Sequence, residues 1–374
     1  MRWHLLLSVL LVSAFACTAS AATEVDTCGQ AFSGEGFLAA DLDCTGFGGD
    51  ALVINAAGSL DLRGFTLTGG NLSAVYCSKS CRIVSEPPGG RIVNAALYGV
   101  NGDLDSVAPE YSPVRITNVT VSGNALDQVI ANGTLTVEDS TIVGTGNLMS
   151  NGVVGNRVAL VRSTVTNTDF AVFGFQGVSV IESDLSNAIG ACVVALNKSA
   201  VIRGSTLSDC GTDGVFGFMY RQQVRVLDST IAGSDGDGID VPTGTQVKVL
   251  RSQISGNAGR GIATGGNRRL IIKDSSIVGN GEGGVYHPSL ARIVRTTITG
   301  NGGSGVSSCF GSLRIATSTI TGNGTNGAVC GVSETCADLS TCEAPVLTDG
   351  SVCGTSYESD SGFPGTNWGV CSAD

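Results

Sequence analysis

The sequence Thr297-Ile298-Thr299-Gly300-Asn301 returns one repeat later as Thr319-Ile320-Thr321-Gly322-Asn323. In each copy an apolar residue lies between Ser or Thr residues and is followed by Gly and Asn. The central apolar residue recurs every 20 to 24 residues, 22.1 on average, at ten positions: Val121, Ile142, Val165, Leu185, Leu207, Ile231, Ile254, Ile277, Ile298 and Ile320. A period this regular indicates a repeat architecture.

Each repeat contains two short strand patterns. An alternating segment such as 247–250 precedes the phrase, and a segment led by Gly and Val or Ile, such as 261–263, follows it. No repeat offers the ten or more residues of 3.6-residue periodicity that a helix needs. A 22-residue unit of strands and turns cannot bury its own apolar side, so it must stack on its neighbours in parallel ladders about 4.8 Å apart. The sequence therefore predicts an all-β solenoid of about 22 residues per turn.

Stacking at this period brings like residues into columns. The asparagines Asn257, Asn280, Asn301 and Asn323 share one position in four turns, where their amides can hydrogen-bond along the axis. A second column carries charges whose sign alternates almost from turn to turn, apart from Gly204: Asp139, Arg162, Glu182, Asp228, Arg251, Asp274 and Arg295, before Thr317 ends it. Opposite charges stacked one strand apart are favourable. We interpret this column as a solvated ladder that holds the register.

The composition excludes several classes of protein. Gly supplies 54 of 374 residues, Pro only 8, and charged residues 14%, while 42% of the chain is apolar. Such a chain is too hydrophobic for a disordered linker, and it lacks the three-residue glycine period of collagen. The formal net charge of −11 argues against nucleic acids and anionic membranes as partners.

The first residues read as a secretory signal. Residues 1–22 contain Arg2, an apolar run from Leu5 to Ala16 and small residues at 19–21. An alternative takes Cys17 as the lipid-bearing cysteine of a bacterial lipoprotein. No later run is long enough to span a membrane. We expect a monomeric protein that is secreted, periplasmic or held at the cell surface.

Twelve cysteines remain after the signal, and they gather near the two ends of the mature chain. In an exported protein this pattern predicts disulfides. The expected pairs are Cys28 with Cys44 and Cys309 with Cys330. The predicted organisation is an N-terminal cap over residues 23–44, a solenoid over 45–332, and a cysteine-rich C-terminal cap over 333–374.

The 22-residue repeat, its Ser-Thr-Ile-x-Gly-Asn phrase, its Gly-Val/Ile strand and the opening segment 52–67 together resemble the right-handed parallel β-helix proteins of the pectin-lyase-like group. The resemblance covers about residues 45–332. It implies a single-stranded right-handed parallel β-helix. It does not imply one activity, because the group includes polysaccharide lyases, hydrolases and epimerases alongside adhesins.

The densest polar group is the segment 234–240, and a shift by one repeat aligns Asp213 with Asp237. Carboxylates on adjacent turns are suited to Ca²⁺, a cation that prefers oxygen ligands, or to an acid and base pair. The predicted metal ligands are Asp213, Asp235 and Asp237, with Ca²⁺ as the only cofactor considered. The alternative is a glycine-spaced Asp turn without a ligand.

The repeat also places Phe216, Asp240, Ala263 and Tyr286 in one column, with His287 beside it. Asp240 and His287 would then lie roughly 10 Å apart. The predicted catalytic residues are Asp240, Tyr286 and His287. Four residues of neighbouring turns are predicted to bind substrate: Tyr220, Arg221, Arg268 and Arg269. Guanidinium groups suit carboxylates, and a carboxylate or imidazole suits proton transfer.

Two alternatives stay open for this site. His287 also fits a surface turn residue before Pro288. Mannuronan epimerases carry a Gly-Phe-Asp-Pro-His phrase on this strand, and its nearest matches here, segments 238–242 and 285–288, are both incomplete. We therefore expect an exported β-helix protein that binds extracellular or cell-wall polysaccharide, as a polyuronate lyase or C5-epimerase. The alternative is a non-catalytic structural or adhesion protein of the cell surface.

Overall fold

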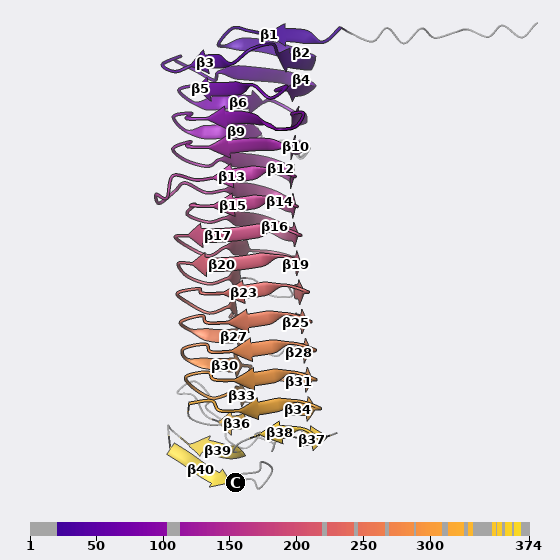
Figure 1. Ribbon diagram of the computed structural model, residues 1–374, viewed down its shortest axis with the longest axis vertical. Helices are drawn as coiled ribbons and strands as arrows, with labels where there is room; N and C mark the ends of the chain where they lie inside the picture. The colour runs from indigo at the N-terminus through magenta and orange to yellow at the C-terminus, as the bar shows by residue number, and fades with distance from the viewer. Residues whose placement is uncertain are drawn as a thin grey trace, which may run out of the picture.

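The computed structural model shows a single elongated solenoid built of strands stacked along one axis (Figure 1). It describes residues 21–102, 113–218, 223–242, 246–265, 269–287, 289–308, 313–324, 328–331, 346–348, 350–353, 356–360 and 363–367. Within these ranges every regular element is a strand. The all-β solenoid predicted from the repeat and the right-handed parallel β-helix implied by the resemblance are confirmed, with about 12 turns of about 23 residues.

Each turn contributes strands to three rows. The first row contains the Gly-Val/Ile strands: β6 (Ser73–Cys77), β9 (Tyr98–Gly102), β18 (Val193–Ala195), β21 (Val215–Gly217), β24 (Ile239–Val241), β27 (Arg260–Thr264), β30 (Gly283–Tyr286), β33 (Val306–Ser308) and β36 (Ala328–Gly331). The second row contains β7 (Cys81–Val84), β10 (Val114–Thr117), β19 (Ala200–Arg203), β22 (Gln223–Leu227), β25 (Gln246–Leu250), β28 (Leu270–Lys273), β31 (Ala291–Val294), β34 (Leu313–Ala316) and β37 (Val346–Thr348).

Longer strands bend across the first two rows: β2 (Gln30–Leu38), β4 (Leu52–Asp61), β12 (Val129–Glu138), β14 (Val153–Val161) and β16 (Val172–Ile181). β1 (Thr23–Val25) pairs with β2, and β39 (Ser356–Asp360) pairs antiparallel with β40 (Phe363–Asn367). In the first turns, β2 pairs in parallel with β4, and residues 42–44 pair in parallel with residues 67–69.

The third row is a separate sheet that contains the repeated phrase. Its strands are β3 (Leu42–Cys44), β5 (Thr66–Gly69), β8 (Gly90–Val93), β11 (Val119–Ser122), β13 (Thr141–Val143), β15 (Thr164–Thr166), β17 (Asp184–Ala188), β20 (Thr206–Cys210), β23 (Thr230–Ala232), β26 (Gln253–Ser255), β29 (Ser276–Val278), β32 (Thr297–Thr299), β35 (Thr319–Thr321) and β38 (Val352–Cys353).

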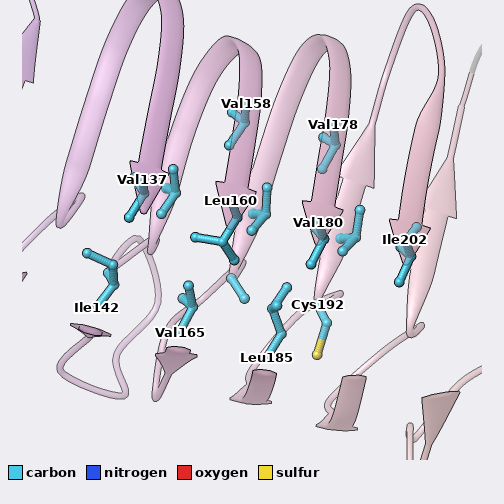
Figure 2. Packing of buried hydrophobic residues seen from close by; sticks show 14 of the residues in the cluster. Val137, Ile142, Val158, Leu160, Val165, Val178, Val180, Leu185, Cys192 and Ile202 are labelled. Atoms are coloured by element: carbon cyan, nitrogen blue, oxygen red, sulfur yellow. The ribbon is translucent and has the colours of Figure 1, made fainter. Parts of the chain in front are cut away.

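The predicted column of apolar residues forms the inner side of the third row. Ile254 pairs with Ile277, and Ile277 with Ile298, as the repeat requires. All ten members of the column are fully buried. Inward residues of the second row, such as Leu160, Val180 and Ile202, point toward Val165 and Leu185 of the third row (Figure 2). Because every turn buries its apolar side against its neighbours, the core is continuous along the axis.

The charge column lies at the corner between the second and third rows. Every member has a positive φ, from 46° at Arg162 to 58° at Gly204. The alternating signs form ion pairs between turns: Arg162 Nε lies 2.7 Å from Asp139 Oδ1, and Arg251 Nε lies 2.6 Å from Asp228 Oδ1. Arg295 pairs with Asp274 in the same way. The predicted ladder is confirmed, and these exposed pairs hold register while adding little stability.

The asparagine ladder is also confirmed. Asn257 Nδ2 donates to Asn280 Oδ1 at 2.9 Å, and Asn301 Nδ2 donates to Asn323 Oδ1 at 2.8 Å. The structure also contains a ladder of serines, which the sequence analysis did not predict. Ser229 N donates to Ser252 Oγ at 3.2 Å, and Ser252 Oγ donates to its own turn at Leu250 O. The two ladders satisfy buried polar groups that the strands leave unpaired.

Three disulfides tie the described chain together. Cys28–Cys44 is the predicted pair, and Cys77–Cys81 and Cys192–Cys210 are the others. Cys309 of the predicted Cys309–Cys330 pair lies outside the described residues. Most of the predicted C-terminal cap over 333–374 lies outside them as well. The part of the chain that the structure describes contains no helix long and apolar enough to cross a membrane.

Candidate functional site

The outward side chains of the first row form the column expected from the repeat. Phe216 pairs with Asp240, Asp240 with Ala263, and Ala263 with Tyr286. The column continues toward the N-terminus through Val194 to Phe173. Because alternate residues of a strand face opposite ways, these side chains face out while Val215 and Ile239 fill the core.

A second outward position lies three residues earlier in each turn. It holds Asp213, Asp237 and Arg260 in three successive turns. Carboxylate oxygens of Asp213, Asp237 and Asp240 all lie within 4.8 Å of one another. We call these three residues the acidic group. Asp237 N donates to Asp213 Oδ1 at 2.8 Å, and Arg260 N donates to Asp237 Oδ1, so backbone amides fix two of the three carboxylates.

The environment of the acidic group favours its protonated forms. Burial raises the pKa of Asp240 to about 6, and the charges of Asp213 and Asp237 raise it as well, while Arg260 opposes them. Burial also raises the pKa of Asp213 and that of Asp237, against the backbone hydrogen bonds that each accepts. Like charges held close together in a half-buried site resist simultaneous ionisation. Asp240 can therefore exchange a proton near neutral pH.

Arg260 links the acidic group to Tyr286. Its guanidinium carbon lies 4.8 Å from the centre of the Tyr286 ring, and its Nε lies 3.6 Å from Glu282 Oε2. A guanidinium over an aromatic face gains a cation–π contact. The same cation lies close enough to Asp237 and Asp240 to lower the pKa of each. The positive charge of Arg260 therefore lies near the carboxylates of Asp237, Asp240 and Glu282.

Aromatic rings adjoin the acidic group on its N-terminal side. Phe216 and Phe218 have ring centres 6.0 Å apart, and Phe173 and Phe175 lie edge to face at 5.0 Å. Phe218 is 54% exposed and Phe175 is 47% exposed. Exposed rings in contact with each other provide flat apolar surface on the outside of the solenoid.

His287 lies one residue beyond this column and faces the other way. It is 1% exposed. Its Nδ1 is hydrogen-bonded with Thr264 Oγ1, and its Nε2 lies 3.2 Å from Leu290 O. The interpretation of His287 as a surface turn residue is wrong, because the strand alternation that turns Tyr286 outward turns His287 inward.

The remaining predicted site residues do not join the acidic group. Asp235 is exposed and is not a member of the acidic group; Asp240 takes the third place instead. Arg269 is exposed and immediately precedes β28 of the second row. Tyr220, Arg221 and Arg268 lie outside the described residues.

Sequence reasoning placed Phe216 in the column but missed Arg260 and the rings of Phe173, Phe175 and Phe218. One further shift of the repeat, from Asp237 to the next turn, would have reached Arg260. It also missed Asp127, which occupies the acidic position four turns before Asp213 and is 8% exposed. Asn151 Nδ2 donates to Asp127 Oδ1 at 2.6 Å, and burial raises the pKa of Asp127 to about 6.

The family model for a right-handed β-helix region matches residues 98–286 and 191–342. The chain therefore belongs to the right-handed β-helix family. A search of curated proteins found no match to this chain.

Several solved structures are similar to this chain at low sequence identity. The A-module of mannuronan C-5 epimerase AlgE4 from Azotobacter vinelandii is 14% identical over 82% of this chain and 80% of its own, with a TM-score of 0.46. The periplasmic alginate epimerase AlgG is 12% identical over 82% and 77%, with a TM-score of 0.42. The Dettilon tailspike protein is 14% identical over 80% and 62%, with a TM-score of 0.26. These likenesses concern the fold alone.

Proposed function

We propose that the protein is an exported β-helix protein that binds polysaccharide along the outer side of its first row and acts on a polyuronate as a lyase or C5-epimerase. The proposal rests on one observation: the acidic group lies close to Arg260, and exposed aromatic rings flank it. Flat apolar rings suit sugar faces, and the carboxylates supply the proton chemistry.

Both polyuronate reactions begin by removing the C5 proton, which is acidified by the adjacent carboxylate of the sugar. We assign this proton to Asp240 as general base. Arg260 would neutralise charge on the uronate carboxylate as negative charge develops there. Elimination of the 4-linked sugar then gives a lyase, and return of a proton to the opposite face of C5 gives an epimerase. Tyr286 is the candidate for that second proton.

His287 is assigned a positioning role in this scheme. Its contacts with Thr264 and Leu290 connect the end of the Tyr286 strand to the preceding turn and to the loop that follows within its own turn. A buried ring with both nitrogens engaged can fix the neighbouring backbone but lies off the outward column. Arg269 is kept as a candidate substrate contact, from the adjoining second row.

Export is part of the proposal. It is supported by the signal pattern in residues 1–22 and by the three disulfides, which form and persist in oxidising compartments.

The test is binding and turnover with the purified mature chain. Polymannuronate, polyguluronate and polygalacturonate are offered to the wild type and to Asp240→Asn and Phe218→Ala. We expect Phe218→Ala to weaken binding by about tenfold through loss of a stacking ring, and Asp240→Asn to abolish turnover while keeping binding. Asp184→Asn, an exposed carboxylate on β17, is the control with the same change of charge. Equal behaviour of all four proteins would contradict the proposal.

A non-catalytic structural or adhesion protein is the second candidate. The asparagine, serine and charge ladders favour it, because they give durability without any reacting group. Failure of every polymer to bind or react would leave this function.

A further inference from the structure

The second row carries positive charge on its outer side. The strands β19, β22, β25, β28, β31 and β34 read AVIR, QVRVL, QVKVL, LIIK, ARIV and LRIA, without a single Asp or Glu. The whole chain has 32 acidic and 21 basic residues. We call five outward cations of these turns the basic strip: Arg225, Lys248, Arg269, Arg292 and Arg314. The strands lie one above another along the solenoid (Figure 1).

Like charges are stacked directly on one another in the basic strip. Arg225 pairs in register with Lys248, and Arg292 with Arg314. Neighbouring strands are about 4.8 Å apart, and like charges facing each other at that spacing are destabilising. The corner row of the same turns avoids this cost, because Asp228 and Asp274 alternate with arginines there.

The cations of the basic strip also have no carboxylate of their own. Among the residues that the structure describes, no ion pair joins Arg225, Lys248, Arg292 or Arg314 to an acid, whereas Arg115, in the same column nearer the N-terminus, pairs with Glu138. Arg225, Arg292 and Arg314 are exposed. Their charge is therefore available to an external anion.

The C-terminal part of the basic strip is hollowed. Arg269, Arg292 and Arg314 line a cavity of about 780 Å³, together with Leu290 and Thr348. Leu290 is 41% exposed and gives the cavity an apolar patch. Guanidinium groups bind carboxylate or sulfate groups through paired hydrogen bonds, so three of them around one hollow suit an anionic ligand.

The shape of the basic strip selects a thin, linear ligand. Arg225, Lys248, Arg292 and Arg314 share one outward column along the axis, which Ile271 interrupts in the turn where Arg269 lies two residues earlier. The adjoining corner row exposes the carboxylates of Asp228 and Asp274. A broad anionic surface would meet those carboxylates and the net charge of −11. A single chain whose charged groups recur about once per rung would meet only the cations.

We propose that the basic strip is a docking site for one chain of an acidic polysaccharide, lying along the solenoid axis with its carboxylate or sulfate groups on the stacked cations. The site is separate from the acidic group, which lies on the first row, and it stands whether or not the first row catalyses a reaction.

The experiment measures binding of polygalacturonate to the full mature chain by calorimetry at low ionic strength and at higher salt. Methyl-esterified polygalacturonate is the uncharged probe. Arg292→Gln/Arg314→Gln is compared with Arg63→Gln/Arg91→Gln, which removes two exposed arginines that lie at the corner and on the third row. We expect the wild type to bind only the charged polymer, with affinity falling as salt rises. The strip variant should lose affinity at least about tenfold, and the control should keep it. Thermal unfolding confirms that each variant is folded.

Three results would overturn the proposal: no salt-sensitive binding of polygalacturonate, equal affinity of the strip variant and the control, or tighter binding of duplex DNA or phosphatidylserine vesicles that depends on Arg292 and Arg314. Dextran sulfate in a parallel titration distinguishes sulfate from carboxylate ligands. Phe218→Ala separates the two sites, because it should weaken binding at the first row and leave unchanged the salt-sensitive binding that depends on Arg292 and Arg314.

Discussion

Asn280 donates a side-chain hydrogen bond from Nδ2 to Oδ1 of Asn301, one turn further along the solenoid, at 2.8 Å. Asn280 Oδ1 in turn accepts from both the backbone N and the side-chain Nδ2 of Asn257. Each buried side-chain amide thus provides a hydrogen-bond partner for the asparagine of the next turn, so Asn280 links three successive turns.

Asn280→Ala should therefore cost about 3 kcal/mol of unfolding free energy, because it leaves two buried donors of Asn257 without their acceptor and removes one of the two donors to Asn301 Oδ1. Asn147→Ala, in an exposed turn, is the control and should change stability by less than about 0.5 kcal/mol. Urea unfolding followed by circular dichroism measures both. Equal stability of the two variants would show that the ladder contributes nothing.

The left-handed corner predicts a stabilising substitution. Thr317 has a φ of 50°, which is strained for a β-branched residue. An earlier turn places Asn118 in the same column at a φ of 56°. We expect Thr317→Asn to raise the unfolding free energy by about 1 kcal/mol. Thr319→Asn, two residues on in the exposed face of β35, should lower it, since Asn is disfavoured in strands. A lower stability for Thr317→Asn would refute the argument.

The repeat period alone predicts several columns of the structure. The Ile254 column, the asparagine ladder and the alternating charges all follow from a period near 22, because stacking converts sequence spacing into contact. The Asp213 and Asp237 alignment follows in the same way. The positive φ of the corner does not, since arginine and aspartate there carry no glycine signal.

The errors at the site have two causes. A strand alternates its faces every residue, so His287, one residue after the outward Tyr286, is buried and not on the surface. Asp235 precedes strand β24, where strand alternation gives no guide to side-chain direction, and it lies outside the acidic group. Arg260 could not be predicted from the carboxylate pattern, because it is a cation that follows Asp213 and Asp237 in the same column.

Asp127 should make stability depend on pH. Burial raises its pKa from 3.8 to about 6, so the folded protein binds the proton more tightly than the unfolded chain does. The stabilisation that comes from protonated Asp127 is fully present below the pKa of Asp127 in the unfolded chain. It is lost as the pH rises through the pKa of Asp127 in the folded protein, and the total loss is about 3 kcal/mol. Asp127→Asn, which keeps an acceptor for Asn151, should be more stable than the wild type near pH 7, with the difference vanishing near pH 4.

Unfolding free energies of the two proteins across this pH range measure the effect. Asp184→Asn, on the exposed side of β17, should show no such pH-dependent difference from the wild type. A difference that stays constant with pH would mean that Asp127 does not titrate between its two expected values.

The acidic group predicts a calcium response. Its three carboxylates are close enough to ligate one Ca²⁺ ion together. Binding would lower the pKa of Asp240 below about 6, because a cation favours the ionised carboxylate. Calorimetry should show Ca²⁺ binding to the wild type and to Asp235→Asn, and at least about tenfold weaker binding to Asp237→Asn. Equal weakening by the Asp235 and Asp237 substitutions would contradict this assignment.

Proton exchange at C5 of a polyuronate tests the central claim most directly, because both lyase and epimerase chemistry must pass through it. The wild type is incubated with each polyuronate in D2O above the pKa of Asp240, and the C5 proton signal is followed by NMR. The account predicts that this signal is replaced by deuterium or lost by elimination with the wild type and with Asp184→Asn, and is retained with Asp240→Asn. Retention of the C5 proton in every polymer with the wild type would contradict it.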